Sequence, residues 1–197
     1  MNTPTLLPAV QNQEMFVNVD APVCTEDECN RILARLDPDA WVPAAVTSED
    51  GYGQVDLDRR SVLRQAVPLA SDDYLCRKIA AAVGHANERF WRFDLTGFPS
   101  YDAPSVLLYD AEVQDHFGVH VDAGPSHSTR KLSFSVQLSP RSEYRGGDLF
   151  FPDDHSTGSR EQGSMTVFSA LTRHEVLPLI SGRRLALVGW FHGPAFR

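Results

Sequence analysis

Hydrophobic and polar positions follow two different periods along the chain, helical near the N-terminus and alternating further on. The first helical stretch begins at Thr25-Glu26-Asp27-Glu28, a capping box in which a hydroxyl and a glutamate three residues later satisfy free backbone NH groups. One apolar stripe follows at helical spacing, formed by Cys29, Ile32, Leu33 and Leu36. Because a proline restricts the residue before it and cannot continue a helix, we expect this helix to end near Asp37-Pro38.

A second helix is predicted after residue 70. Ser71 would cap it, and Asp72 and Asp73 would lie in its first turn, where the positive end of the helix dipole favours carboxylates. Its expected buried stripe contains Tyr74, Leu75, Ile79, Ala82, Val83, Ala86 and Phe90. Residues 41–67, between the helices, show no clear period and include a polar, glycine-bearing loop at 48–53. That loop is either a plain connection, which loop statistics favour, or a cover for a site.

Past Asp94 the pattern alternates, as it does weakly at 15–19, where we expect a short edge strand. Turn signals such as Ala123-Gly124-Pro125, Arg145-Gly146-Gly147-Asp148 and Ser181-Gly182 separate the later strands. Those strands are expected at 105–109, 117–122, 132–138, 149–151, 165–169 and 184–191. Many short strands after two helices predict an α+β chain whose C-terminal half is a β-sandwich or a jelly roll.

Length, composition and charge narrow the class of protein. The 197 residues fit a single domain, 1–197, with 42% hydrophobic and 22% charged residues, as in ordinary globular proteins. No apolar run approaches the ~18 residues that cross a bilayer, and residues 1–13 lack the features of a signal peptide, so we expect a soluble, cytoplasmic protein. The net charge of -8 argues against nucleic acid and membrane partners. Cys24, Cys29 and Cys76 lack metal-site spacing and are expected to be reduced.

The stretch from His116 to Asp122 carries the candidate chemistry. In a strand, side chains two residues apart project together, so His120 and Asp122 would present an imidazole and a carboxylate to one point. A third ligand would complete a set of two histidines and one carboxylate, the arrangement that non-haem Fe(II) oxygenases use. The spacing alone is common by chance, so the flanking segments have to support this hypothesis.

The C-terminal segment from Thr172 to Trp190 resembles a family signature. The prolyl 4-hydroxylase-like (PKHD-type) branch of the Fe(II)/2-oxoglutarate oxygenases has a His, a Val-x-Pro-like stretch, a Gly-x-Arg or Gly-x-Lys turn and a strand ending in Trp. Other motifs follow the family's order, namely Arg92 to Gly97, Tyr109 before the His-x-Asp pair, Ser139 to Leu149 with its Gly-Gly-acid turn, and Gly163 to Phe168. The resemblance covers about 90–194 and only loosely the helical part.

This resemblance implies a double-stranded β-helix (jelly roll, cupin-like) core at 93–197, with supporting helices and edge strands at 1–92. It implies a 2-oxoglutarate-dependent dioxygenase in which the catalytic residues His120, Asp122 and His174 bind Fe(II). Arg184, ten residues after His174, would pair with the distal carboxylate of 2-oxoglutarate, and Tyr109 would add a hydroxyl. Oxygen would be the oxidant and ascorbate a reductant.

Parity along the last strand distinguishes two neighbouring arginines. Arg184 shares a face with Ala186, Val188 and Trp190, so Arg183 is expected to face away. Ser133, Ser135 and Gln137 likewise share one face of a strand, which either lines the cavity or meets solvent. His116 and His127 flank the triad as substrate contacts or exposed loop residues, whereas His85, His155 and His192 are expected to be structural or solvated.

Relatives in this family act on prolyl residues, free amino acids or natural-product intermediates, and the short chain favours a small-molecule or peptide substrate. Two departures occur: the spacing between Tyr109 and His120 is longer than usual, which predicts an altered loop at 110–115, and Phe117 replaces a common tyrosine. A zinc hydrolase and a silent binding module are the alternatives. The first leaves Arg184 unexplained, and no ligand is lost to support the second. Asp122 argues against halogenation, which uses a small residue there.

Overall fold

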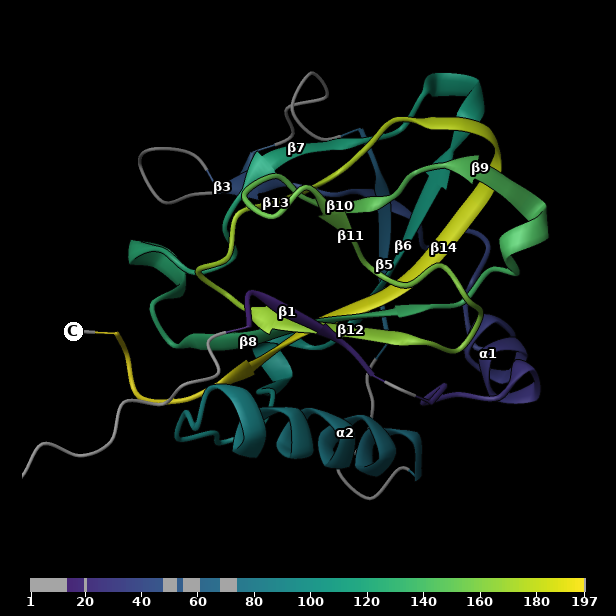
Figure 1. Cartoon of the computed structure of the whole chain (residues 1–197). Coiled ribbons are helices and arrows are strands. Elements are labelled where there is room, and N and C mark those ends of the chain that lie inside the picture. The colour runs from purple at the N-terminus through teal and green to yellow at the C-terminus, as the bar shows by residue number, and fades with distance from the viewer. Residues whose placement is uncertain (1–13, 20, 48–52, 55–60, 68–73, 197) are drawn as a thin grey trace, which may run out of the picture.

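The computed structural model describes residues 14–19, 21–47, 53–54, 61–67 and 74–196 of the chain. Two sheets face each other, and two helices cover the outer surface of the larger sheet (Figure 1). Within those described ranges, no helix is long and apolar enough to cross a membrane.

The first predicted helix forms as α1 (Glu26–Leu33) and begins with the expected capping box. The NH of Glu28 donates to the hydroxyl of Thr25 at 3.2 Å, and the NH of Thr25 donates to the carboxylate of Glu28 at 2.8 Å. The helix ends before the proline that was expected to stop it. The NH groups of Arg35 and Leu36 already bond to carbonyls three residues earlier, so the chain tightens into a turn there.

The second helix is α2 (Tyr74–Phe90), and its predicted cap at residues 71–73 lies outside the described part of the chain. Its buried positions include Leu75, Ile79, Val83 and Ala86, as expected. Tyr74 was wrongly assigned to that stripe, because its side chain is 61% exposed and its ring lies beside the ammonium group of Lys78 on the helix surface. The expected stripe is therefore confirmed except at its first residue, with Ala82 and Phe90 half-buried.

The larger sheet has the strand order β1-β12-β8-β14-β6-β5-β2, with β9 pairing to β14 beside this path. Its strands are β1 (Phe16–Asn18), β2 (Val42–Pro43), β5 (Leu63–Ala66), β6 (Ser105–Asp110), β8 (Arg130–Gln137), β9 (Tyr144–Gly146), β12 (Met165–Ser169) and β14 (Leu179–His192). The turn predicted at Ser181-Gly182 is wrong. Gly182 bends the strand at a φ of 76° but stays paired with Tyr144, so β14 continues through it.

The smaller sheet has the order β11-β10-β13-β7. Its strands are β7 (Phe117–His120), β10 (Leu149–Phe151), β11 (Ser156–Thr157) and β13 (His174–Val176). A separate hairpin pairs β3 (Val46–Thr47) with β4 (Gly53–Gln54). Residues 41–67, which show no period in the sequence, thus supply two strands of the larger sheet and this hairpin, while 48–52 and 55–60 lie outside the described residues.

Alternation along the strands divides the interior into two apolar clusters. Val106 and Val167 pack with the helices, whereas their neighbours Leu107 and Phe168 face the smaller sheet. The first cluster attaches α1 and α2 to the larger sheet, and the second fills the space between the two sheets. This arrangement confirms the α+β class with a jelly-roll core, and it leaves the inter-sheet space as the place where side chains from both sheets meet.

Ile79 lies fully buried on α2, so Ile79→Ala should lower the free energy of unfolding by about 2–5 kcal/mol, through lost apolar burial and the cavity left behind. Urea unfolding of the metal-free protein measures this. Glu88→Ala on the exposed side of the same helix is the control and should change stability by less than about 0.5 kcal/mol. Equal effects of both substitutions would show that α2 does not pack on the sheet as described.

Candidate active site

Two histidines far apart in the sequence are direct neighbours across two strands. His120 on β7 and His174 on β13 are paired in the antiparallel register, and their ring centres are 4.2 Å apart. The Nδ1–H of His120 donates to the carbonyl of Gly118 at 2.8 Å, and that of His174 donates to the carbonyl of Thr172 at 3.0 Å. Because a carbonyl can only accept, Nδ1 of each ring is the donor, and Nε2 is the nitrogen that faces the space between the rings and Asp122.

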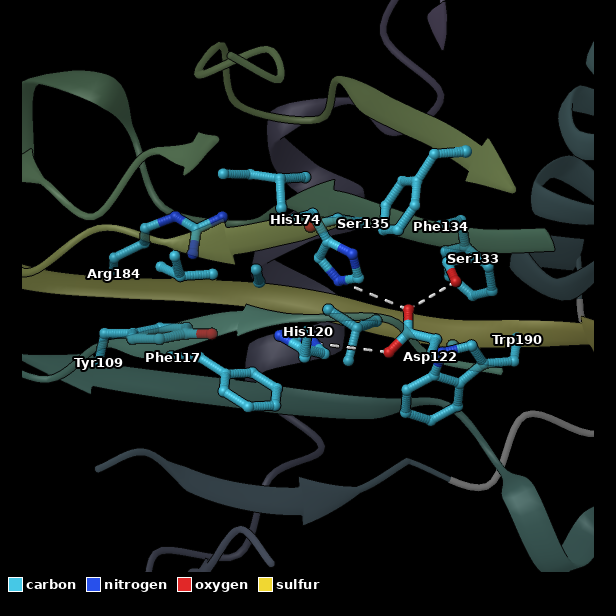
Figure 2. A pocket seen from close by; sticks show the side chains of 16 residues that line it. Tyr109, Phe117, His120, Asp122, Ser133, Phe134, Ser135, His174, Arg184 and Trp190 are labelled. Carbon is cyan, nitrogen blue, oxygen red and sulfur yellow. Dashed lines mark hydrogen bonds and ion pairs between the residues drawn. The ribbon is translucent and has the colours of Figure 1, made fainter. Parts of the chain in front are cut away.

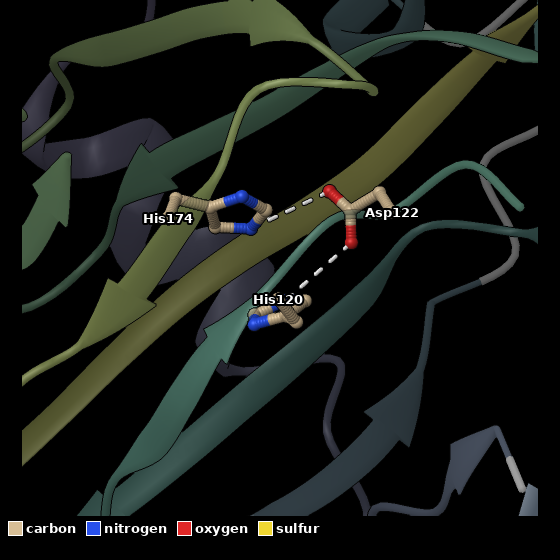
Figure 3. Close-up of side chains that lie close together, drawn as sticks. All are labelled: His120, Asp122 and His174. Carbon is tan, nitrogen blue, oxygen red and sulfur yellow. Dashed lines mark ion pairs between the residues drawn. The ribbon is translucent and has the colours of Figure 1, made fainter. Parts of the chain in front are cut away.

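Asp122 completes this group from the turn after β7. The NH groups of Asp122 and Ala123 both donate to the carbonyl of Ala170, which fixes the turn against the end of β12. The hydroxyl of Ser133 donates to Oδ2 of Asp122 at 2.6 Å. The Nε2 atoms of His120 and His174 lie 3.6 Å and 3.5 Å from the two carboxylate oxygens (Figure 3).

The three side chains fit a single metal ion. Their ligand atoms all lie within 4.8 Å of one another. Adjacent donors that share one ion at about 2.1 Å stand about 3 Å apart, and the two nitrogen–oxygen separations of 3.6 Å and 3.5 Å are close to that spacing. Each donor is also held from behind, the imidazoles by carbonyls and the carboxylate by a hydroxyl, as is usual for metal ligands. Two nitrogens and one oxygen suit a divalent transition metal such as iron.

The carboxyl group of Asp122 stays ionised in this environment. Burial would raise its pKa, but the neighbouring imidazoles of His174 and His120 and the Ser133 hydroxyl hold the pKa far below the usual range. The site therefore presents a carboxylate rather than a carboxylic acid at neutral pH.

All five residues singled out in the sequence line one pocket between the sheets (Figure 2). His120, Asp122 and His174 lie at one end, while Arg184 and Tyr109 lie at the other. The pocket also has an apolar lining, formed by Phe117, Leu149, Phe168, Val176, Ala186 and Val188. The pocket thus combines a metal-type donor set with a cation across an apolar interior.

Arg184 is buried without a carboxylate partner among the described residues, with only 4% of its surface exposed. Its Nε–H donates to the side-chain oxygen of Gln137 at 3.1 Å, and its guanidinium carbon lies 5.2 Å from the centre of the Tyr109 ring. Arg183 takes the opposite orientation expected from parity. Its side chain is 65% exposed and pairs with Asp110 at 2.7 Å on the outside of the sheet.

The Gly-Gly-acid turn makes room for this arginine. Gly147 has a φ of 65°, and a Cβ atom there would stand 2.8 Å from Leu179 and 3.2 Å from the side-chain stem of Arg184. At Gly146, with a φ of 77°, a Cβ atom would stand 2.6 Å from the carbonyl oxygen of Pro178. Two successive glycines are therefore required for β9 to pass close to the start of β14.

The side chains of β8 have an orientation and hydrogen-bond partners that the sequence did not specify. Ser133, Ser135 and Gln137 do face the interior, which decides between the two orientations left open for that strand. Neither the bond from Ser133 to Asp122 nor that from Arg184 to Gln137 was foreseen. Alternation along β8 indicated that these side chains share a face, but no motif in the sequence indicated their hydrogen-bond partners.

A second polar network, centred on Arg130, was missed. The guanidinium of Arg130 donates twice to Asp102 at 2.8 Å and once to the carbonyl of Asp122 at 3.3 Å, and it stacks 3.6 Å from the Trp190 ring. His192, expected to be structural or solvated, is buried and contacts Asp102 through Nε2 at 3.0 Å. This network braces the back of the metal-type group and one wall of the pocket.

The loop at 110–115, predicted to be altered, is tightly closed. It contains a 3-10 turn (Ala111–Val113), and the NH of Asp110 donates to the carboxylate of Asp115 at 2.8 Å. His116 lies 3.2 Å from the hydroxyl of Ser61, and His127 is half-buried near the Arg130 network. Neither histidine belongs to the metal-type group.

Comparison with known proteins assigns this architecture to a family. Residues 104–192 match the family model described as the 2OG-Fe(II) oxygenase superfamily. A PKHD-type hydroxylase from Stutzerimonas stutzeri is 30% identical over 183 residues, which cover 86% of this chain and 75% of that protein. Another, from Synechococcus, is 41% identical over 91 residues, but the match covers only 44% of this chain and 40% of that protein.

Solved structures support the same fold. A Pseudomonas putida prolyl-4-hydroxylase superposes with a TM-score of 0.65 at 21% identity, covering 90% of this chain and 92% of that one. A Trichoplax adhaerens prolyl hydroxylase superposes with a TM-score of 0.68 at 15% identity, covering 90% and 83%.

The chain therefore belongs to the 2OG-Fe(II) oxygenase superfamily, whose members use Fe(II), 2-oxoglutarate and oxygen. Within it, the chain is a member of the PKHD-type group and is a 2-oxoglutarate-dependent dioxygenase by class.

Ser133→Ala removes the only hydroxyl seen to donate to Asp122 among the described residues, so we expect metal affinity to fall about tenfold to a hundredfold. Titration of the metal-free variant with Co(II), followed by visible absorbance, measures this. Ser156→Ala, on β11, should bind Co(II) as the unsubstituted protein does. An unchanged affinity in Ser133→Ala would mean that the hydroxyl does not orient the carboxylate.

Proposed function

We propose that this protein hydroxylates an unactivated C–H bond of an amino-acid, peptidyl or natural-product substrate, coupled to decarboxylation of 2-oxoglutarate to succinate. The observation that carries this proposal is the buried guanidinium of Arg184, which has no carboxylate partner in the described part of the chain and shares one pocket with the His120, Asp122 and His174 group. A buried arginine cannot discharge itself by losing a proton, so it needs an anion. A small dicarboxylic acid that reaches the metal would supply one.

His120, Asp122 and His174 would hold Fe(II) on one side and leave its other side open to the pocket. Arg184 would pair with the distal carboxylate of 2-oxoglutarate through the fork of its terminal nitrogens. Tyr109, whose side chain lies against Arg184, would add its hydroxyl to that carboxylate. When bound, iron and 2-oxoglutarate together supply the oxidation of a C–H bond by oxygen.

The chain's own residues would orient these groups and exclude water. Phe117 stacks on the His120 ring with 3.5 Å between ring centres, and Phe168 lies edge-on to His174, so both imidazoles are held by apolar walls. Val176 and Val188 add apolar side chains to the lining of the same pocket. Such a dry interior strengthens the pairing of Arg184 with a carboxylate and limits side reactions with water.

Two observations support a substrate class, namely the names of relatives and the net charge. Several relatives carry the name PKHD-type hydroxylase, and one solved neighbour is a prolyl hydroxylase in complex with a peptide fragment. We therefore propose a peptide, such as a prolyl peptide, or a small molecule as substrate. The net charge of -8 makes nucleic acid a poor partner.

The two alternative functions, a zinc hydrolase and a silent binding module, do not explain why Arg184 lies in the pocket. A zinc hydrolase would use the three donors but has no need for a buried Arg184. A silent binding module would be expected to have lost a donor or the arginine, and both are present in this pocket.

Anaerobic addition of Fe(II) and 2-oxoglutarate should produce the visible charge-transfer band of the chelated complex. Arg184→Ala should weaken 2-oxoglutarate binding about a hundredfold or more, because it removes a paired charge from a buried site. Arg183→Ala is the control and should bind normally, because Arg183 faces away from the pocket. His174→Ala should give no band.

Absence of the band with the unsubstituted protein would contradict the proposal, as would a normal band in His174→Ala. If Arg183→Ala abolished binding and Arg184→Ala did not, the assignment of the two arginines would be reversed. Succinate release in the presence of candidate prolyl peptides and free amino acids then identifies the substrate.

A further inference from the structure

Arg184 is held from both of the strands that flank β14. On one side, Tyr109 of β6 is its direct partner in the antiparallel register, and the guanidinium lies near the face of that ring. On the other side, Gln137 of β8 pairs with Ala186, two residues further along, so its side chain reaches Arg184 diagonally on the same face. The guanidinium is thus positioned by contacts that do not involve a ligand.

The amide of Gln137 has one orientation in these surroundings. Its side-chain nitrogen lies 3.5 Å from the carbonyls of Ser139 and Leu185, which can only accept hydrogen bonds. The amide oxygen is therefore the atom turned toward Arg184, and it accepts from Nε at 3.1 Å. Gln137 is only 2% exposed, so water does not compete for this contact.

The backbone of Gln137 is also fixed. Its NH donates to the carbonyl of Ser164 at 3.0 Å, and its own carbonyl accepts from the NH of Gly163 at 2.7 Å. A buried side chain with a fixed backbone and a fixed amide plane loses little further freedom when a ligand arrives.

From this geometry we infer that Gln137 is a positioning residue for the cosubstrate's distal carboxylate, which rests on the proposed function of the pocket. By occupying Nε of Arg184, the neutral amide directs the two terminal nitrogens toward the pocket. A neutral acceptor leaves the positive charge of the guanidinium available to the ligand, whereas a carboxylate at this position would neutralise it. Gln137 therefore acts on the dicarboxylic acid only through Arg184.

A positioning role predicts a selective loss of 2-oxoglutarate binding, which general damage to the pocket would not produce. Gln137→Leu should weaken 2-oxoglutarate binding about tenfold or more, because a fixed, charged donor loses its acceptor. Binding of 2-oxopentanoate should stay unchanged, since this acid has the same carbon chain and the same metal-binding end but no distal carboxylate. Gln137→Glu should weaken 2-oxoglutarate binding further than Gln137→Leu, because an internal carboxylate would compete for the guanidinium.

Dissociation constants for both acids are measured anaerobically with the Fe(II)-loaded protein from the visible band. Gln162→Leu is the matched control, because Gln162 also donates from its amide to a backbone carbonyl, that of Leu138, whereas the Nε–H of Arg184 donates to Gln137. It should bind both acids normally.

Failure of the unsubstituted protein to bind 2-oxoglutarate would overturn the proposed function itself. If the unsubstituted protein binds 2-oxoglutarate but Gln137→Leu binds it equally well, the positioning role is overturned and the proposed function stands. Equal losses for 2-oxoglutarate and 2-oxopentanoate would also overturn the positioning role, because they would reveal a general disturbance of the pocket.

Discussion

The site depends on the hydrogen-bond ladder along both edges of β14. This strand pairs with β6 on one edge and with β8 on the other, and its first part also pairs with β9. A strand bonded on both sides cannot shift by one residue without breaking two ladders and turning every side chain to the opposite face. The inward orientation of Arg184 is therefore maintained by backbone pairing over the whole strand, and burying an arginine becomes possible because its position is enforced.

Much of the site could be predicted because several of its features follow from local patterns in the sequence. Parity in extended strands indicated that Arg184 and Arg183 face opposite sides, and it placed Asp122 beside His120, although Asp122 lies in the turn after β7 and not in the strand expected to reach it. The capping box at Thr25 identified the start of α1 without any tertiary information. The family resemblance then linked His174 to the first pair, a connection that the amino-acid pattern alone does not contain.

Features that depend on contacts between distant segments could not be predicted in the same way. The bond from Ser133 to Asp122 and that from Arg184 to Gln137 each join different strands, and alternation specifies a face but not a partner. The turn expected at Ser181-Gly182 was wrong because a glycine at positive φ resembles a chain reversal in sequence, while pairing with β9 keeps it within a strand. Tyr74 was misplaced because the helical period does not show which positions of the stripe are covered, and this first residue of α2 is exposed.

One consequence concerns the indole of Trp190. The Arg130 guanidinium covers one of its faces at 3.6 Å, and Asp102 and the Asp122 carbonyl hold that guanidinium in place. Only the opposite face and the ring edges remain for a molecule that enters the pocket. Trp190 can therefore meet such a molecule through one ring face at most, so a planar group could stack on a single side of the indole.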